Sequence, residues 1–371
     1  MGTKTHATVP ESVLAMFKAH EGLYVVDDPE AKCTNIIAVH NTNLGPALGG
    51  CRRRADYVGM WGPFFDVARL SRGMTYKAAL LGVPLGGGKS VMVPWNNSKR
   101  LRKRQFRSMG MLVESLSGKY ICAEDVGTTV ADIVQMKGVT SHVCGTLKDH
   151  PYKGDPSPMT ALGVYHSLRA ALYFATGSDE LAGRSVYIEG IGKVGMPLAR
   201  MLASDGARLC VSNRTKEASE REALMKAQDE LHATVVELNA SGVPDNFPSV
   251  DVYAPCALGG VINHDRIYAY PFSLKVIAGS ANNMLLNPDE DGKFLMRRKI
   301  VYAPDYVANN RGLWDVYHQL TGSYDLEKVK EGCKKNYPLT FELLERSHML
   351  GIPPHQTADQ MAEAIFNKKR E

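Results

Sequence analysis

A pattern of three glycines in the second half of the chain constrains its fold more than any other feature. Gly190, Gly192 and Gly195 follow a G-x-G-x-x-G spacing. The apolar stretch 185–189 before them predicts a buried strand, and 194–203 after them predicts a helix with one apolar face. In this strand–turn–helix context the spacing indicates a dinucleotide-binding turn, because the glycines permit the turn and a pyrophosphate rests on the helix N-terminus.

Further strand-like segments follow at regular intervals and alternate with helical ones. The predicted strands are 207–213, 234–238, 251–254, 276–279 and 300–303. This rhythm predicts parallel strands joined by crossover helices, with ligands bound at the carboxyl ends of the strands. The length of 371 residues favours two domains rather than one.

The end of the strand at 207–213 should choose the cofactor. An acidic residue about 20 positions past the glycines would hydrogen-bond the ribose hydroxyls of NAD. Asn213 stands there instead and is followed by Arg214, Thr215 and Lys216. Asparagine removes the carboxylate that would repel a 2′-phosphate, and Arg214 can pair with one. The pattern favours NADP; the alternative is NAD with a solvated basic turn.

Two lysines of the first half lie in the segment RGMTYKAALLGVPLGGGKS at 72–90. Lys77 belongs to a helix-like stretch with apolar residues at three- and four-residue spacing. Lys89 ends a run of three glycines, 86–88, which would let backbone approach a ligand closely. A flexible loop is the alternative. A phosphate-binding loop is disfavoured, because its first glycine would have to be residue 83, which is Val83.

Two carboxylates follow the next apolar strand. The block YICAEDVGTT at 120–129 carries Glu124 and Asp125 into a turn closed by Gly127. Such carboxylates are often helix caps, but next to two lysines a carboxylate and an ammonium group can make a proton-transfer pair. The glycine-rich segment 45–50 predicts a tight turn and a wall of the same site.

These residues carry a family resemblance. The blocks LGPALGGCR at 44–52, RGMTYK at 72–77 and LGGGK at 85–89 resemble the amino-acid dehydrogenases related to leucine, phenylalanine, valine and glutamate dehydrogenase. Similar blocks follow at 120–129, at 254–263 (APCALGGVIN), at 278–283 (AGSANN) and at 302–307 (YAPDYV). The resemblance is closest to the leucine, phenylalanine and valine branch.

The resemblance implies an α/β fold of two domains separated by a cleft. Residues 1–150 would form an α/β domain for substrate binding, catalysis and oligomerisation, and 151–345 a Rossmann-type dinucleotide-binding domain. Residues 346–371 would form a helical segment that packs back on a domain or a subunit. The implied activity is reversible oxidative deamination of a neutral, branched-chain or aromatic, L-amino acid to the 2-oxo acid and ammonia.

The resemblance also implies the roles of individual residues. Lys89 would be the general base that activates water, and Asp125 would carry protons to and from the substrate nitrogen, with no metal required. The expected substrate-binding residues are Lys77, Gly49, Gly50, Leu48, Ala123, Asn283 and Val307. The expected cofactor-binding residues are Thr160, Gly190, Gly192, Lys193, Val194, Gly195, Asn213, Arg214, Cys256, Ala257 and Asn283.

The chain departs from its relatives after Val307. They usually continue N-A-G-G, whereas Asn309, Asn310, Arg311 and Gly312 follow here. Arg311 would either lie near the cleft and alter substrate range or activity, or face solvent. Two other functions stay open: a relative that processes or condenses 2-oxo acids without net deamination, and a non-catalytic nucleotide-binding protein. The retained lysines and carboxylate argue against the second.

Composition excludes several classes of function. The formal net charge is +5 and no long basic run stands out, so nucleic acid is not implied. Seven scattered cysteines without a C-x-x-C predict reduced thiols, with Cys256 expected in the core. The sequence lacks the apolar stretch of a signal peptide. It also lacks a run of about 18 apolar residues that could span a membrane. Both observations predict a cytoplasmic protein. Relatives are oligomers, so at least a homodimer is expected.

Overall fold

The computed structural model describes residues 10–146, 149–152, 154–214, 217–322 and 324–368. The chain divides into two compact units, which we call the first unit (1–154 with 365–371) and the second unit (155–364). The expected boundary at 345 falls inside helix α13 (Asn336–Leu350), which packs along α5 (Ser157–Thr176) and so belongs with the second unit. Ile365 and Phe366, at the end of α14 (Pro354–Phe366), are grouped with the first unit.

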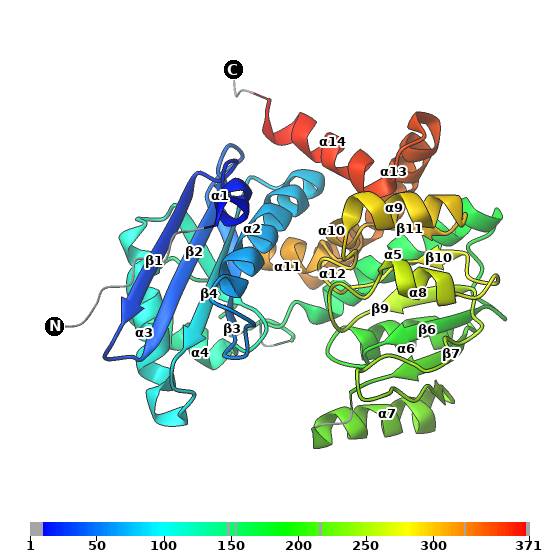
Figure 1. The fold of residues 1–371 in the computed structure, drawn as a ribbon, viewed down its shortest axis with the longest axis horizontal. Coiled ribbons are helices and arrows are strands. Elements are labelled where there is room, and N and C mark those ends of the chain that lie inside the picture. The colour runs from blue at the N-terminus through cyan, green and yellow to red at the C-terminus, as the bar shows by residue number, and fades with distance from the viewer. Residues whose placement is uncertain (1–9, 147–148, 153, 215–216, 323, 369–371) are drawn as a thin grey trace. The chain divides into compact units, whose positions relative to one another are not determined.

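Within the described residues, five strands of the first unit form one sheet in the order β1-β2-β4-β3-β5 (Figure 1). They are β1 (Gly22–Asp28), β2 (Cys33–Asn41), β3 (Ala47–Arg53), β4 (Gly86–Pro94) and β5 (Tyr120–Glu124). β1, β2 and β4 pair antiparallel, whereas β3 pairs parallel with both β4 and β5. The carboxyl ends of β3, β4 and β5 therefore point the same way.

Helices cover both faces of this sheet, so that β2, β3 and β4 are buried on both sides. Along β2, Ile36 packs with Val67 of α2 (Gly62–Leu81), whereas Ile37 packs with Phe106 of α3 (Lys99–Ser115). Helix α4 (Val130–Lys137) lies beside α3, and α1 (Glu11–Met16) beside α2. We call the face covered by α2 the α2 face.

The two glycine-rich segments of the first unit are strands, not the loop and the tight turn considered above. Ala47–Arg53 is β3 and Gly86–Pro94 is β4, both inside the sheet. A Cβ on Gly87 would lie 2.0 Å from the Thr75 nitrogen of α2, and one on Gly49 would lie 1.8 Å from the Gly88 oxygen. At Gly87 and Gly49, the close approach that requires glycine is therefore to neighbouring backbone of the protein itself.

Within the described residues, the second unit contains a parallel sheet with the strand order β11-β10-β9-β6-β7-β8 (Figure 1). Its strands are β6 (Ser185–Glu189), β7 (Arg208–Ser212), β8 (Thr234–Val235), β9 (Val252–Pro255), β10 (Val276–Ile277) and β11 (Val301–Tyr302). In chain order this is the 3-2-1-4-5-6 arrangement of the Rossmann fold. The predicted parallel strands are confirmed.

The helices between these strands connect them as crossovers. They are α6 (Gly195–Ser204), α7 (Ala218–Leu231), α8 (His264–Ala269) and α9 (Pro288–Arg297). After β11 follow α10 (Asp305–Ala308), α11 (Arg311–Leu320), α12 (Leu326–Lys334) and α13. Helix α5 packs on β10, β11 and α6, and also on α11, α12 and α13. Tyr187, Tyr253 and Tyr302 lie in the core on one face of the sheet.

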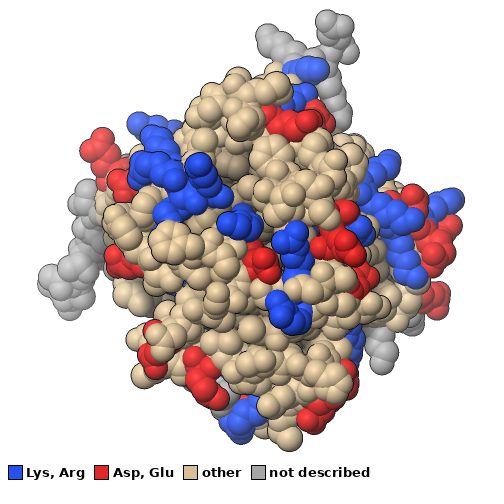
Figure 2. Space-filling model, turned by 90° about the vertical axis from the view of Figure 1, so that its right-hand side faces the viewer, with Lys and Arg blue, Asp and Glu red and all other residues tan. Residues whose placement is uncertain are grey.

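The surface drawn in Figure 2 carries charges of both signs, and the cysteines are unpaired with one another. On the face drawn in Figure 2, basic and acidic side chains lie among uncharged residues and neither sign covers it. All seven cysteines lie in the described part of the chain and are free thiols. Among the helices of the described residues, none is long and apolar enough to cross a membrane.

Candidate active site

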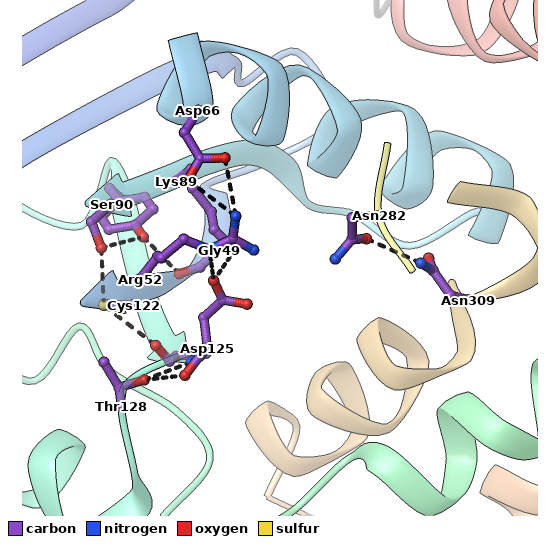
Figure 3. Close-up of polar contacts among 12 residues, drawn as sticks. Gly49, Arg52, Asp66, Lys89, Ser90, Cys122, Asp125, Thr128, Asn282 and Asn309 are labelled. Atoms are coloured by element: carbon purple, nitrogen blue, oxygen red, sulfur yellow. Dashed lines mark hydrogen bonds and ion pairs between the residues drawn. The ribbon is translucent and has the colours of Figure 1, made fainter. Parts of the chain in front are cut away.

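The first unit brings Lys89 and Asp125 together. Side chains alternate along β4, so Lys89 points to the same face as Val91, which packs on the α2 face. Asp125 directly follows β5. Lys89 Nζ lies 3.1 Å from Asp125 Oδ2 (Figure 3). The lysine and carboxylate expected to form a proton-transfer pair are neighbours.

The pair is shielded from water and strongly polarised. The Lys89 and Asp125 side chains are 6% and 17% exposed. Burial alone would raise the pKa of Asp125, but the charges of Lys89 and Arg52 and their hydrogen bonds outweigh it, so the pKa is lowered. Asp125 is therefore an anion at neutral pH.

Asp125 is not a helix cap, which was the alternative reading. Its backbone N–H donates to Thr128 Oγ1, and that hydroxyl donates to the Asp125 carbonyl, both at 2.7 Å. Helix α4 is capped by Thr129, which forms a capping box with Asp132. The carboxylate of Asp125 is thus left for the site.

β3 places backbone beside the pair. The Gly49 carbonyl accepts a hydrogen bond of 2.6 Å from Tyr120 OH. A Cβ on Gly50 would lie 2.7 Å from Asp125 Cβ, so a side chain there would displace the carboxylate. The other expected substrate residues of this unit are Leu48 on β3 and Ala123 on β5, both buried, and Lys77 on α2, half-buried.

Sequence reasoning missed three residues around this pair. Arg52 Nε lies 3.0 Å from Asp125 Oδ2, and its NH1 lies 3.0 Å from each carboxylate oxygen of Asp66 on α2. Tyr57 OH donates to Asp66 Oδ2 at 2.6 Å. In the sequence, Arg52 could have been noticed because it ends the block 44–52. That it contacts Asp125 becomes evident only once β3 is known to lie between β4 and β5.

In the second unit, the three fingerprint glycines have distinct surroundings. Gly190 has φ of +105°, and a Cβ there would lie 2.7 Å from Ala257 Cβ. A Cβ on Gly195 would lie 1.9 Å from the Gly190 oxygen, whereas one on Gly192 would meet no described atom within 4 Å. Protein packing requires the first and third glycines, and the open space at the second fits a pyrophosphate.

The other expected cofactor residues gather at the same end of this sheet. Cys256 and Ala257 follow β9, which pairs with β6 at the point where the strand order reverses. Val194 precedes α6, and Lys193 Nζ lies 3.3 Å from Asp155 Oδ2. Cys256 is half-buried rather than a core residue, because it sits past the strand end.

The residues expected to choose the cofactor follow β7. Asn213 is half-buried and its amide donates to the Glu220 carbonyl of α7 at 3.3 Å. Arg214 is exposed. Thr215 and Lys216 lie outside the described residues. The described strand end thus presents an amide and a guanidinium, as the sequence predicted.

Asn283 has a constrained backbone. It has φ of +53°, and its N–H donates to Asp305 Oδ2 at 2.9 Å. Tyr302 OH donates to the other oxygen of Asp305 at 3.1 Å. Nearby, the amide of Asn309 donates to Asn282 Oδ1 at 3.0 Å (Figure 3). This network fixes Asn283, because the left-handed region is unfavourable for a non-glycine residue.

Thr160 and Val307 lie on two helices of the same unit. Thr160, on α5, donates its hydroxyl to the Pro156 carbonyl at 3.0 Å. A Cβ on Gly312 would lie 2.3 Å from Thr160 Oγ1, which explains why this glycine of the altered turn stays small. Val307, on α10, is fully buried.

Arg311 does not face solvent, which was one of its two expected positions. It is 3% exposed, and its Nε donates to Asn336 Oδ1 at 2.5 Å. The Asn336 amide donates to the carbonyls of Val307 and Ala308 at 3.1 and 3.0 Å. Burial lowers the pKa of Arg311 to about 10. The guanidinium is held inside the second unit because Gly163 leaves room for it: a Cβ there would lie 2.7 Å from Arg311 Cγ.

A second buried ion pair was also missed. Glu189, at the end of β6, lies 2.6 Å from Arg266 NH2 and accepts a hydrogen bond of 2.5 Å from Tyr253 OH. The three residues come from β6, α8 and β9, and no local pattern links them. Among the described residues, no group of three or more His, Cys, Asp or Glu side chains is placed to hold a metal ion.

A Rossmann-type unit with an open fingerprint turn, together with a unit that buries a lysine–aspartate pair, defines a nucleotide-dependent oxidoreductase. Comparisons with known proteins give the family. Residues 23–142 match the model of the Glu/Leu/Phe/Val dehydrogenase dimerisation domain, and residues 155–328 match that of glutamate/leucine/phenylalanine/valine dehydrogenase. The chain belongs to this family of amino-acid dehydrogenases, whose members depend on a nicotinamide dinucleotide.

Individual relatives are similar over almost the whole chain. A leucine dehydrogenase of Thermoactinomyces intermedius is 40% identical over 353 residues, 95% of this chain and 92% of that one. A valine dehydrogenase of Streptomyces coelicolor is 36% identical over 95% of this chain and 93% of that one. The crystal structure of L-tryptophan dehydrogenase from Nostoc punctiforme has a TM-score of 0.76 at 33% identity, covering 97% of this chain and 98% of that one.

Proposed function

We propose that this protein catalyses the reversible oxidative deamination of a neutral L-amino acid to its 2-oxo acid and ammonia, with NADP preferred over NAD. The observation that carries the proposal is the buried Lys89–Asp125 pair, at 3.1 Å, in a unit that matches this family. The relatives named leucine, phenylalanine, valine and tryptophan dehydrogenase support a neutral substrate.

Three side chains of the first unit divide the chemistry. Lys77 binds the substrate carboxylate, helped by backbone at Gly49 and Gly50. Asp125, an anion, accepts a proton from the substrate ammonium group, so that the free amine can be oxidised to the imine. Lys89, acting as the free amine, takes a proton from water as the water oxygen bonds to the imine carbon. Asp125 returns its proton to the nitrogen, and ammonia leaves as the carbon–nitrogen bond breaks and the hydroxyl proton passes to water, which forms the carbonyl.

The second unit holds the cofactor. When bound there, a nicotinamide dinucleotide would supply the acceptor for a hydride from the substrate α-carbon. The open space at Gly192 and the N-terminus of α6 receive the pyrophosphate, because unpaired N–H groups at a helix N-terminus favour an anion. Thr160 and Asn283 hold the nicotinamide end.

The preference for NADP rests on the turn after β7. Asn213 supplies no negative charge against a 2′-phosphate, and the exposed Arg214 is available to pair with one. The alternative, NAD, requires that Arg214 stay solvated when the cofactor is bound.

The substrate side chain is assigned to an apolar pocket. In the first unit, Leu48 and Ala123 are buried apolar residues at positions expected to contact that side chain. Differences of a methylene in such a pocket discriminate only about 10- to 200-fold. The proposal therefore names the class, branched-chain or aromatic, and not one amino acid.

The test follows reduced-nicotinamide absorbance with a panel of L-amino acids, with NAD and NADP supplied separately. We expect ammonia-releasing turnover with one class of neutral amino acid. Lys89→Ala should abolish turnover, by about 10³-fold or more, and leave NADP binding unchanged. Full turnover in that variant would refute the assigned mechanism.

A second candidate function is processing or condensation of 2-oxo acids without net deamination, raised by the departure at Asn310 and Arg311. Burial of Arg311 inside the second unit weakens the reason for it. Wild-type protein that binds NADP but turns over no amino acid would favour that candidate over the dehydrogenase.

A further inference from the structure

The two oxygens of the Asp125 carboxylate have different surroundings. Oδ2 lies 3.1 Å from Lys89 Nζ and 3.0 Å from Arg52 Nε. Oδ1 has no hydrogen-bond or ion-pair partner among the described residues. Figure 3 shows Oδ2 turned toward both cations and the other oxygen pointing away from them. One oxygen is held, and the other is left for a further partner.

Arg52 is itself anchored at its far end. Its NH1 lies 3.0 Å from both oxygens of Asp66, whose Oδ2 also accepts a 2.6 Å hydrogen bond from Tyr57 OH. The Arg52 and Asp66 side chains are 14% and 20% exposed, so water competes little with this pair. A chain of three side chains therefore leads from the segment before α2 to the Asp125 carboxylate.

We propose that Arg52 is a positioning residue for Asp125, that Tyr57 and Asp66 act through it, and that Asp125 Oδ1 is the oxygen that exchanges a proton with the substrate nitrogen. This inference rests on the proposed function. It adds Arg52, Asp66 and Tyr57, to which the proposed function assigns no role. A lysine ammonium on a flexible stem gives its contact no fixed direction, whereas a planar guanidinium anchored on Asp66 directs its Nε at Asp125 Oδ2. The proton carrier is thus pre-oriented before substrate binds.

The charged and titratable groups around Asp125 give the variants different signatures. Lys89 faces it from β4, Arg52 from β3 with the Cys51 thiol beside it, and Asp66 lies behind Arg52 on α2. Removing the Arg52 charge raises the pKa of Asp125, because one of the two opposing cations is lost. Removing the Asp66 charge does not raise it, because the Arg52 charge is then less neutralised. Both changes loosen the carboxylate.

The experiment measures the pH dependence of kcat/KM, and separately the titration of Asp125 by ¹³C NMR of carboxyl-labelled protein, assigned with Asp125→Asn. For Arg52→Gln we expect the acid limb of the profile and the NMR titration to move to higher pH. kcat should fall by about 10- to 100-fold. Arg52→Lys keeps the charge but not the fork, so its acid limb should stay near that of the wild type while kcat still falls.

Two further variants keep the test decisive if the Arg52 variants do not fold. Asp66→Asn and Tyr57→Phe should lower kcat, by about tenfold for the first, with KM less affected and no upward movement of the acid limb. The matched control is Arg346→Gln, which breaks the Arg346–Glu342 pair on the surface of α13, where both side chains are 52% exposed. It should leave both profiles unchanged.

The outcomes separate this inference from the proposed function. An Asp125 titration that is the same in wild type and Arg52→Gln, or wild-type kcat in both Asp66→Asn and Tyr57→Phe, overturns the positioning role while amino-acid turnover stands. Absence of turnover in the wild type, with the Asp125 titration still moved by Arg52→Gln, refutes the proposed reaction instead.

Discussion

A single side chain after β7 should set the cofactor preference. In Asn213→Asp, a carboxylate would hydrogen-bond the ribose hydroxyls of NAD and repel a 2′-phosphate. We expect the ratio of kcat/KM for NADP to that for NAD to fall by about 10- to 100-fold. Arg214→Gln should lower the NADP value and leave the NAD value nearly unchanged. If the wild type prefers NAD and Arg214→Gln changes neither value, the basic turn is solvated and the NADP proposal is wrong.

A buried histidine should make the first unit sensitive to acid. His40 is 4% exposed and its Nδ1 lies 2.8 Å from Thr75 Oγ1. The pKa of His40 is lowered from 6.5 to about 3, mainly because the side chain is buried. The charges of His20 and Arg72 lower it further, and Glu21 has a smaller, opposite effect. The unfolded chain therefore binds a proton below pH 6.5 that the folded chain refuses until about pH 3, so stability is lost as pH falls through this window.

The check is urea unfolding of the wild type and His40→Asn between pH 8 and pH 4. The full displacement of the His40 pKa corresponds to about 5 kcal/mol, of which the part above pH 4 is measurable. In His40→Asn, which keeps a polar partner for Thr75, the unfolding midpoint should fall less steeply with acid. Replacing the exposed His264 by Asn should leave the slope unchanged. Equal slopes in His40→Asn and the wild type would contradict the prediction.

At the residue scale, sequence pattern picked out Lys89 and Asp125, to which we assign the chemistry. It did not pick out the residues that contact them from other strands and helices. Lys89 and Asp125 stand out because each ends an informative block. Arg52, Asp66 and Tyr57 became visible only through the strand order, since β3 lies between β4 and β5 and α2 covers that face. For Arg311 the sequence left two positions open, near the cleft or facing solvent, and its burial was not predicted because the room for it, at Gly163, lies on another helix.

Among the elements, the contact between β4 and α2 should tolerate no side chain at its closest point. A Cβ on Gly87 would lie 2.0 Å from the Thr75 nitrogen, which is backbone and cannot rotate away. We expect Gly87→Ala to destabilise the protein by about 3 kcal/mol or more. Gly73 lies within α2 itself, with no described atom within 4 Å of a Cβ. Gly73→Ala should therefore stabilise by about 0.5–1 kcal/mol.

Urea unfolding midpoints of the two variants, compared with the wild type, provide the measurement. Opposite signs are expected, so a general intolerance of alanine in this region is excluded by the same experiment. A Gly87→Ala protein as stable as the wild type would mean that α2 and β4 are further apart than in the structure.

The strands of the second unit were predictable, as was β5 in the first, whereas β3 and β4 were not, for a physical reason. Buried parallel strands read as short apolar runs, and those at 185–189 and 251–254 were located within a residue or two of β6 and β9. β3 and β4 contain glycines where strands usually contain β-branched residues, so propensity indicates a turn or a loop. The close approach of neighbouring backbone that requires these glycines is a tertiary property.

On the scale of the whole molecule, β1 is an edge strand that one chain leaves uncovered. Within the described residues it pairs with β2 on one side, and Leu23, Val25 and Val26 are 38%, 45% and 42% exposed. An unpaired apolar edge is unfavourable in a free monomer. The segment lies at the start of the region that matches a dimerisation domain. We therefore expect a homo-oligomer with β1 in an interface between copies.

Sedimentation velocity of the wild type and of Val25→Lys tests this expectation. A lysine at an edge position blocks strand pairing and places a charge in an apolar contact, so the variant should dissociate at protein concentrations where the wild type stays associated. Val58→Lys is the matched control, because Val58 is 93% exposed in the same unit but outside its sheet. If both variants keep the wild-type sedimentation coefficient, or the wild type is a monomer, β1 is not the contact. The apolar residues on this edge would then need another cover, since exposed apolar strands otherwise favour aggregation.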